Sequence, residues 1–303
     1  MARIIKVGVL TACVLAVGAW AGWGAPTNLG SGVNTTSAEL DPALDAGGWN
    51  LYFASNRGGG FGGYDLWSST YAGSSWQPAS NLSNIVNSSS NERGPAVYQG
   101  TNLEVYFSSD RAGGQGNYDI WRTYNSGGVW HTPTVQTVLN STSDDLQPYI
   151  LASSPAKCYF ASNRPGGFGG YDIWVSTYGS SNWTTPVNLG AGVNTSANEL
   201  GPTMDTAATV LYFYSDRQGG WGNYDLYAAI PTGGTWGNAE NLGSPPNSPS
   251  AEYKPGTTSA ASPVFFASDR SGGTGGFDLW STTWMEEPGV APASLGRIKA
   301  LLR

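Results

Sequence analysis

Short apolar and aromatic stretches alternate with clusters of Gly, Asn, Ser and Pro from about residue 22 onwards. No window keeps a 3.6-residue apolar period, and the apolar stretches are rich in aromatic and β-branched residues, which predicts short strands rather than helices. In the first such unit we expect strands near 39–46, 50–57, 64–71 and 75–83, the second and third joined by a Gly-rich hairpin loop at 58–63. The pattern therefore predicts an all-β protein.

One strand motif, apolar-Tyr/Phe-Phe-x-Ser-Asp/Asn-Arg, recurs at a nearly fixed distance. Its five copies begin 53 or 54 residues apart, at Leu51, Val105, Cys158, Leu211 and Val264. Each copy is followed by a Gly-rich loop and then by an aromatic residue, an Asp, an apolar residue and a Trp or Tyr. A four-stranded sheet of this size cannot bury both of its faces alone, so the five units must stack on one another.

The way the stack closes is also visible in the sequence. A fourth-strand signature begins at Trp76, Trp130, Trp183 and Trp236, is missing after the last unit, and occurs ahead of the first unit at Trp23. A ring that uses this N-terminal segment to complete the last unit leaves no open sheet edge. We therefore predict a five-bladed β-propeller with four-stranded blades of about 53 residues, closed by the N-terminal strand.

The segments at the two ends lie outside the repeat. Residues 1–21 contain Arg3 and Lys6, an apolar run and Ala19-Trp20-Ala21, which predicts a signal peptide with cleavage after Ala21. Lipidation of Cys13 is the alternative, because Leu-Thr-Ala precedes it. We expect a propeller over 22–284, a linker and short helix or sorting tail over 285–303, and no membrane span after cleavage. The protein is thus expected to be exported, whether periplasmic, cell-surface or secreted.

The composition excludes several kinds of chemistry. With one His and two Cys in 303 residues, the chain has too few ligands for a zinc cluster and few partners for Ser-His or Cys-His catalysis. A net charge of −7 argues against nucleic-acid binding. No cofactor is predicted; calcium is the alternative, because residues 59–65 resemble a Gly-Gly-x-Gly-x-Asp loop, but each loop supplies one carboxylate.

The repeated block Ser-Asp/Asn-Arg-x-Gly-Gly-x-Gly-x-Tyr-Asp-Ile/Leu-Trp, preceded by Pro-Val-Asn-Leu-Gly, occurs between residues 23 and 284. It resembles the WD40-like (PD40) repeats of TolB-type periplasmic and envelope β-propellers. The resemblance implies a binding or scaffold propeller, with an envelope or extracellular protein as its partner. A fold of this kind serves many functions, so the function must be inferred from individual residues.

Opposite charges flank each Gly-rich loop. Because these positions face each other across a hairpin, we expect each pair to form an ion pair within the blade or a hydrogen-bond clamp on the Gly-rich loop. The pairs are Arg57 with Asp65, Arg111 with Asp119, Arg164 with Asp172, Arg217 with Asp225, and Arg270 with Asp278.

An acidic residue stands three positions before a proline in every unit. These residues are Glu39, Glu92, Asp145, Glu199 and Glu252. If they open the innermost strands, they form a ring of carboxylates at the channel mouth, where they raise one another's pKa or attract a cation. The alternative is that each carboxylate accepts backbone N–H bonds from the turn before its strand.

Three loop aromatics occur where the repeat does not require them. Phe61, Phe168 and Trp221 take a position that Gln115 and Thr274 hold in the other units, and exposed aromatics predict contact with a partner or a glycan.

Five acids depart from the fivefold pattern without forming an evident catalytic pair: Asp41, Asp45, Glu104, Asp144 and Asp205. The sequence thus favours a non-enzymatic, protein-binding propeller. A carbohydrate-binding, lectin-like propeller is the alternative, and a glycoside-active enzyme comes third.

Overall fold

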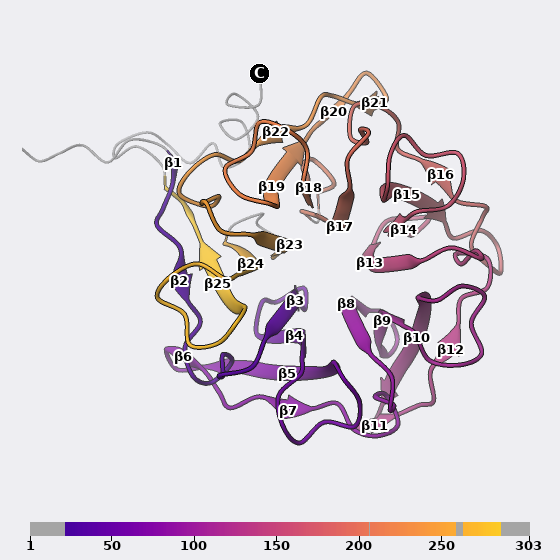
Figure 1. The fold of residues 1–303 in the computed structure, drawn as a ribbon. Helices are drawn as coiled ribbons and strands as arrows, with labels where there is room; N and C mark the ends of the chain where they lie inside the picture. The colour runs from indigo at the N-terminus through magenta and orange to yellow at the C-terminus, as the bar shows by residue number, and fades with distance from the viewer. Residues whose placement is uncertain (1–21, 206, 259–262, 286–303) are drawn as a thin grey trace, which may run out of the picture.

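The computed structural model describes residues 22–205, 207–258 and 263–285, and all regular structure in these residues is β. Five antiparallel sheets surround a central axis, with one strand of each sheet at the centre (Figure 1). This confirms the predicted five-bladed propeller. No helix of the described residues is long and apolar enough to cross a membrane.

Each blade runs from an inner strand at the axis to a short outer strand at the rim. Blade 1 contains β3 (Glu39–Leu44), β4 (Asn50–Ser55), β5 (Asp65–Ala72), β6 (Ser75–Trp76) and β7 (Ser80–Asn81). Blade 2 contains β8 (Glu92–Gln99), β9 (Leu103–Ser109), β10 (Asp119–Ser126), β11 (Val129–Trp130) and β12 (Thr134–Val135). Blade 3 contains β13 (Asp145–Leu151), β14 (Lys157–Ser162), β15 (Asp172–Thr177) and β16 (Val187–Asn188). Blade 4 contains β17 (Glu199–Met204), β18 (Leu211–Ser215), β19 (Asp225–Ala229), β20 (Pro231–Thr232), β21 (Thr235–Trp236) and β22 (Glu240–Asn241). Blade 5 contains β23 (Glu252–Thr257), β24 (Val264–Ser268), β25 (Asp278–Thr282) and, from the N-terminal side, β2 (Thr27–Asn28).

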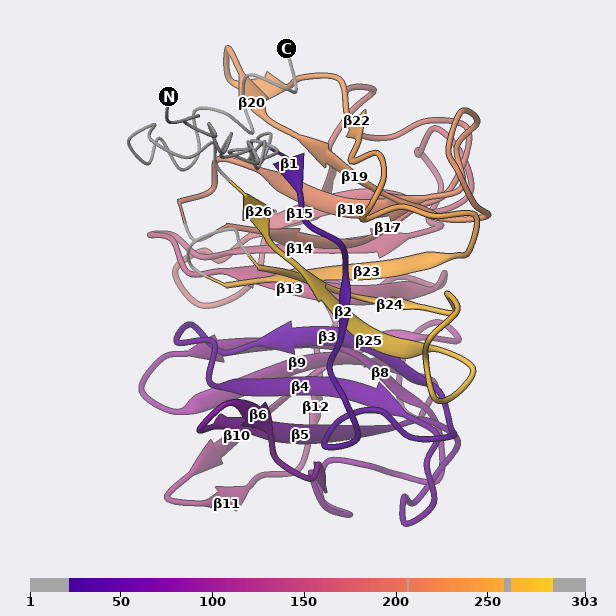
Figure 2. The same ribbon diagram turned by 90° about the vertical axis from the view of Figure 1, so that its left-hand side faces the viewer.

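The ring closes through the N-terminal strand, as predicted. β2 pairs with β25 of the last blade, and Figure 2 shows the two strands side by side. β1 (Gly22–Trp23) pairs with β26 (Trp284–Met285), and the indoles of Trp23 and Trp284 meet edge to face with centroids 5.3 Å apart. The two ends of the described chain are therefore held together by backbone pairing and by aromatic packing.

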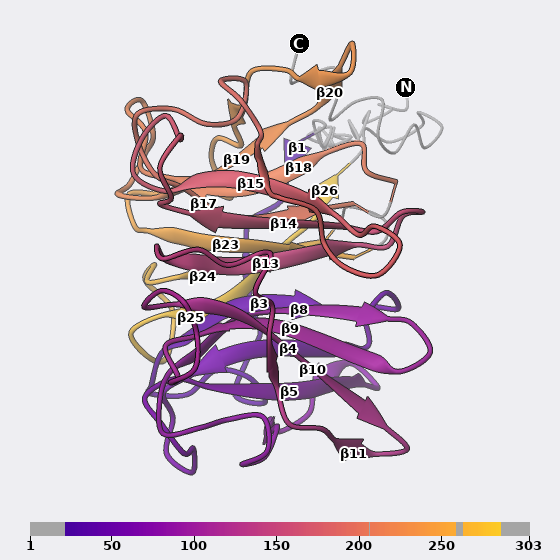
Figure 3. The ribbon, with the colours of Figure 1, turned by 90° about the vertical axis from the view of Figure 1, so that its right-hand side faces the viewer.

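Buried aromatics hold each blade to its neighbours. The second strands are mostly buried, and their phenylalanines Phe53, Phe107, Phe160, Phe213 and Phe266 are fully buried. The tryptophan that begins the outer-strand segment packs on the preceding blade, as Trp183 does on Tyr106 with centroids 6.2 Å apart. Inner strands of adjacent blades, such as β8 and β13, lie side by side (Figure 3). The core is thus a set of interblade layers.

The repeated arginines do not pair with the aspartates that we predicted. In blade 1, Arg57 Nη2 lies 3.0 Å from Glu39 Oε1, and its guanidinium lies over the rings of Phe53 and Trp67. The other four arginines form the same ion pair, Arg111 with Glu92, Arg164 with Asp145, Arg217 with Glu199 and Arg270 with Glu252. Ser55 lies opposite both Glu39 and Asp65 in register, so the arginine two residues later can reach either side, and it turns toward the fully buried carboxylate.

The repeated aspartates stabilise the Gly-rich loops instead. The Asp65 carboxylate accepts the backbone N–H of Phe61 at 3.0 Å and of Gly62 at 3.3 Å. The equivalent loops are bound in the same way by Asp119, Asp172, Asp225 and Asp278. Each aspartate therefore fixes the hairpin loop that precedes it, which a carboxylate does well because the loop has free N–H donors.

The predicted signal peptide, residues 1–21, and the tail from residue 286 onwards lie outside the described residues. The predicted cleavage site, the lipidation of Cys13 and the C-terminal helix therefore stay predictions.

Candidate functional site

The inner strands carry a bulge that directs one residue of each blade into the channel. The third residue of each inner strand has a positive φ, between 31° and 60°, and precedes a proline; the five are Asp41, Gly94, Gln147, Gly201 and Lys254. The strand register shifts around this position in every blade. A positive φ is unusual for residues other than glycine, and bulges often direct a side chain into a site. At this position the fivefold symmetry is broken, because two blades have glycine and the other three have side chains that differ in charge and size.

The Asp41 carboxylate joins three blades at the axis. It accepts hydrogen bonds from Arg93 Nε at 3.2 Å, from the backbone N–H of Gly94 at 3.1 Å and from Gln147 Nε2 at 2.7 Å. Gln147 Oε1 in turn accepts the hydroxyl of Tyr214 from blade 4 at 3.1 Å. Asp41 is fully buried, and its charge is balanced by Arg93. The network fixes the side chains of Arg93 and Gln147 at the base of the channel mouth.

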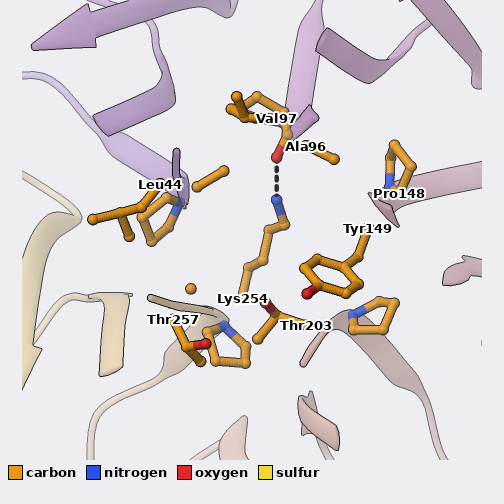
Figure 4. Close-up of a pocket in the computed structure, with 14 residues that line it drawn as sticks. Leu44, Ala96, Val97, Pro148, Tyr149, Thr203, Lys254 and Thr257 are labelled. Atoms are coloured by element: carbon orange, nitrogen blue, oxygen red, sulfur yellow. Dashed lines mark hydrogen bonds between the residues drawn. The ribbon is translucent and has the colours of Figure 1, made fainter. Parts of the chain in front are cut away.

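Lys254 closes the channel from blade 5. Its Nζ donates to the carbonyl oxygen of Pro95 in blade 2 at 2.8 Å, and Figure 4 shows the side chain extending toward Ala96 and Val97. The space around it measures about 30 Å³, which is room for about one water molecule. Burial lowers the pKa of Lys254 to about 8, partly opposed by the charge of Asp41. The channel is therefore blocked near its middle, and its two mouths are separate.

One mouth contains a polar pocket of about 150 Å³, which we call the mouth pocket. Arg93, Tyr118, Asp144, Gln147, Tyr171 and Tyr214 are among the residues that line it. Asp144 Oδ2 accepts the hydroxyl of Tyr171 at 2.7 Å, and Oδ1 accepts the backbone N–H of Tyr118 at 3.2 Å. Burial, then the hydrogen bond and charge of Asp144, raise the pKa of Tyr171. The tyrosine therefore stays a hydrogen-bond donor to the carboxylate.

Aromatic residues surround this mouth. The residue before each loop aspartate is aromatic and half-buried; we call these five, Tyr64, Tyr118, Tyr171, Tyr224 and Phe277, the mouth aromatics. Tyr253 lies 5.2 Å from Tyr224 and 4.9 Å from Phe277 between ring centroids, and Arg93 lies over the Tyr64 ring at 5.0 Å. Aromatic faces beside fixed polar groups form a surface suited to a ligand that has both apolar faces and hydroxyl groups.

An exchange of Asp and Asn places the Asp144 carboxylate in the pocket. In blades 2 and 4 an Asn precedes the inner strand and bonds to an Asp after the second strand, Asn91 to Asp110 and Asn198 to Asp216. In blade 3 the two residue types are exchanged, and the Asp144 N–H donates to Asn163 Oδ1 at 2.9 Å. The negative charge thus moves from the end of the second strand to the wall of the mouth pocket.

The predicted acidic ring does not face the channel. Glu39, Glu92, Asp145, Glu199 and Glu252 are fully buried inside their own blades. Glu39, for example, accepts the backbone N–H of Thr35 at 2.8 Å and the hydroxyl of Ser55 at 2.9 Å, besides its pairing with Arg57. These contacts occupy the carboxylates, so the ring cannot bind a ligand in the channel; the alternative, bonding to the preceding turn, describes the geometry.

The predicted loop aromatics are exposed. Phe61, Phe168 and Trp221 are 49%, 50% and 57% exposed and stand three residues before the mouth aromatics Tyr64, Tyr171 and Tyr224 in the same loops. Contact between these loop aromatics and a ligand stays a prediction. Calcium also stays untested, although the described residues contain no group of three or more His, Cys, Asp or Glu able to hold a metal ion.

Sequence reasoning noted Asp41 and Asp144 but missed Arg93, Gln147 and Tyr214. For Gln147 the signal was present in the variable third residue of the inner-strand motif, between a constant acid and a constant proline. Arg93 is the second residue of the same motif and Tyr214 precedes the serine of the second-strand motif, and both of these positions also vary among the five units. A repeat position that varies while its neighbours stay constant has no role that all blades share.

No family model matches the sequence, and no curated protein matches it. The fold, however, matches solved structures over most of the chain. A thermostable family-43 glycoside hydrolase is 13% identical, with a TM-score of 0.58 over 85% of this chain and 93% of that chain. An endo-arabinase of Bacteroides thetaiotaomicron is 11% identical, with a TM-score of 0.56 over 88% of this chain and 100% of that chain. An α-L-arabinanase of Penicillium chrysogenum, solved with arabinobiose, is 13% identical, with a TM-score of 0.52 over 89% and 99%.

The fold is shared with glycoside hydrolases. The assignment to WD40-like (PD40), TolB-like propellers is therefore wrong, and so is the expectation of a non-enzymatic scaffold that binds an envelope protein. The repeated block misled because its charged residues make contacts within the blade, such as Arg57 with Glu39. It specifies how a blade packs, and propellers of different function can share that packing.

Proposed function

We propose that this protein binds a saccharide in the mouth pocket and hydrolyses a glycosidic bond there. The observation that carries the proposal is the exchange of Asp and Asn in blade 3, which places the Asp144 carboxylate beside Arg93 and within the wall of mouth aromatics. The shared fold with glycoside hydrolases, one of them solved with arabinobiose, supports carbohydrate as the ligand class.

The pocket offers what a sugar ring requires. Tyr118 and Tyr171 supply aromatic surface for the C–H face of a sugar, while Arg93 and Asp144 supply a donor and an acceptor for hydroxyl groups. Arg93 is 33% exposed at its side chain and is held by the buried Asp41, so its remaining N–H groups are fixed in direction. Fixed polar groups give specificity because a ligand does not have to order them on binding.

Hydrolysis breaks the bond between the anomeric carbon and the leaving oxygen, which takes up a proton while water adds to the carbon. Carboxyl groups normally carry out these proton transfers. We assign to the Asp144 carboxylate the removal of a proton from the attacking water, while the leaving oxygen takes up its proton from solvent. Asp144 Oδ2 accepts the Tyr171 hydroxyl within the pocket wall. Asp41 is a positioning residue, because it is fully buried and acts through Arg93 and Gln147.

Asp144→Asn tests this assignment, because Asn occupies the same position in blades 2 and 4 and accepts the same backbone N–H, as Asn91 does from Tyr64. With arabinan and β-1,3-galactan as substrates, we expect kcat/KM to fall about 100-fold or more. The melting temperature should stay unchanged, because the structural hydrogen bond is kept.

The matched control is the double variant Asp144→Asn with Asn163→Asp. It gives blade 3 the same Asn and Asp positions as blades 2 and 4 and keeps the net charge, but it removes the carboxylate from the mouth pocket. We expect it to be as stable as the wild type and as inactive as Asp144→Asn. Full activity in either variant would show that Asp144 does not act on the bond.

We also propose that the protein acts outside the cytoplasm. The support is the sequence of residues 1–21, which has the basic, apolar and small-residue parts of a signal peptide. Cell fractionation of the full chain, with N-terminal sequencing of the mature protein, tests both the export and the cleavage after Ala21.

A further inference from the structure

A second pocket lies between blades 2 and 3, apart from the mouth pocket. It measures about 290 Å³, and we call it the interblade pocket; Tyr98, Glu104, Tyr106, Arg122, Tyr178 and Trp183 are among the residues that line it. It shares no residue with the mouth pocket. Its blade 2 residues include Tyr98 near the end of β8, Glu104 near the beginning of β9 and Arg122 within β10. The mouth pocket uses the opposite ends of β8 and β9, at Arg93 and Ser108.

A bidentate ion pair forms one wall of the interblade pocket. Arg122 Nε and Nη2 donate to the two carboxylate oxygens of Glu104 at 2.8 and 2.7 Å. The hydrogen bonds from Arg122 to Glu104 raise the pKa of Arg122, so the guanidinium stays protonated at physiological pH. The side chains remain 33% and 16% exposed, which leaves N–H groups and carboxylate lone pairs available to a ligand.

This pair belongs to blade 2 alone. In blades 1, 3, 4 and 5 the residues equivalent to Glu104 are Asn50, Lys157, Val210 and Pro263. The residues equivalent to Arg122 are Ser68, Val175, Ala228 and Ser281. The packing of a blade therefore does not require the pair, since four blades form without it.

Aromatic side chains also line the interblade pocket. Trp183 meets Tyr178 edge to face at 5.1 Å and Tyr106 at 6.2 Å between ring centroids. Tyr178 is 42% exposed, so one aromatic surface at the pocket is open to solvent. The pocket therefore combines apolar aromatic faces with a fixed pair of donors and acceptors.

We propose that the interblade pocket is a second saccharide-binding site, which holds a neutral sugar unit away from the mouth pocket. Glu104 and Arg122 neutralise each other, so the site favours a ligand without net charge, and their parallel donors and acceptors match neighbouring hydroxyl groups. A volume near the lower end of small-ligand pockets fits one or two sugar rings. The ligand class rests on the proposed function, and such a site would hold a polysaccharide chain on the protein while another part of the chain enters the mouth pocket.

Isothermal titration with arabinobiose, cellotriose and β-1,3-galactotriose tests the proposal. We expect the wild type to bind two equivalents of at least one probe. The double variant Glu104→Gln with Arg122→Met removes both charges together, so no buried charge is left unpaired. This variant and Tyr178→Ala should each weaken one of the two binding events at least 10-fold or abolish it. Lys157→Ala changes the blade 3 counterpart of Glu104 and should keep both events.

The outcomes separate the two proposals. A single binding event that is unchanged in the interblade variants overturns the second site and leaves the mouth pocket as the binding site. A single event that the interblade variants abolish, in a protein without glycosidase activity, supports the second site and contradicts the proposed function. No binding of any probe overturns the second site, and hydrolysis of arabinan or galactan then tests the mouth pocket by itself. Unchanged melting temperatures show that a lost event reflects the pocket and not the fold.

Discussion

The N–H groups of Tyr64 and Tyr118 are accepted by different residues at one repeat position, Asn91 and Asp144. The backbone geometry is the same in both blades, and the side chain decides what the position can do. Asp144 has a second carboxylate oxygen, which accepts the Tyr171 hydroxyl in the wall of the mouth pocket, whereas Asn91 has an amide nitrogen there that donates to Asp110. A single residue exchange at a repeat position, with the backbone hydrogen bond kept, is therefore enough to place a carboxylate in the pocket.

Lys254 gives a prediction at this scale, because its pKa is about 8 in the native state, whereas a lysine side chain free in water has a pKa of 10.5. Below pH 8 both states bind the proton, and Lys254 adds no pH dependence. Between pH 8 and 10.5 the native state has lost the proton while the unfolded state keeps it, so the native protein gains stability as pH rises. Relative to Lys254→Met, the free energy of unfolding should rise by on the order of 3 kcal/mol across this window.

Urea unfolding of both proteins from about pH 7 to about pH 10 measures this difference. Buried tyrosines such as Tyr214, whose pKa burial raises above 10.0, act in the opposite direction at high pH, but they are present in both proteins and cancel. A difference that stays constant over the range would show that burial does not lower the pKa of Lys254.

The recurring hairpin loop shows how an element is fixed by its own sequence. In blade 1 the Asp65 carboxylate bonds to the backbone of Phe61 and Gly62, and the chain comes so close to it that a side chain at Gly60 has no room. A Cβ on Gly60 would lie 2.0 Å from Asp65 Oδ2. The glycines and the aspartate of this loop therefore act together, which explains why they recur as one block.

Gly60→Ala tests this element. The added methyl group must displace the Asp65 carboxylate and break its bonds to the loop, so the free energy of unfolding should fall by about 1–3 kcal/mol. Gly58→Ala is the matched control in the same loop, because nothing lies within 4 Å of a Cβ at that position. It should change stability by less than about 0.5 kcal/mol in the same urea titration. Equal effects of the two substitutions would show that the contact with Asp65 does not limit the loop.

At the scale of the whole molecule, the features that all five units share were predictable from the sequence. The spacing of the motif that begins at Leu51, the hairpin loops and the displaced copy at Trp23 led to the number of blades and to the closure, because repeats must pack on like neighbours. The partners of Arg57 and Glu39 were not predictable, since Ser55 faces strands on both of its sides and only the packed structure decides between them. The mouth pocket was missed for a related reason. It combines Arg93, Asp144 and Tyr214 from blades 2, 3 and 4, and no periodicity along the chain shows which single positions of separate blades meet at the axis.

Closure is a property of the whole ring and gives the last prediction. Without residues 23–30, β25 loses its pairing with β2, Leu279 loses its bond to the backbone of Leu29, and Trp284 loses the indole of Trp23. Blade 5 is then left with an open edge, which destabilises the ring and offers a strand to a second molecule. We expect the deletion to lower the melting temperature by about 10 °C or more, at roughly 2–4 °C per kcal/mol for a chain of this size, and to promote association. Calorimetry with size-exclusion chromatography measures both effects. Trp23→Ala is the control, because it keeps the β2 pairing, and it should lower the melting temperature by less than half as much as the deletion does. A deletion variant that melts like the wild type and stays monomeric would show that the N-terminal strand does not close the propeller.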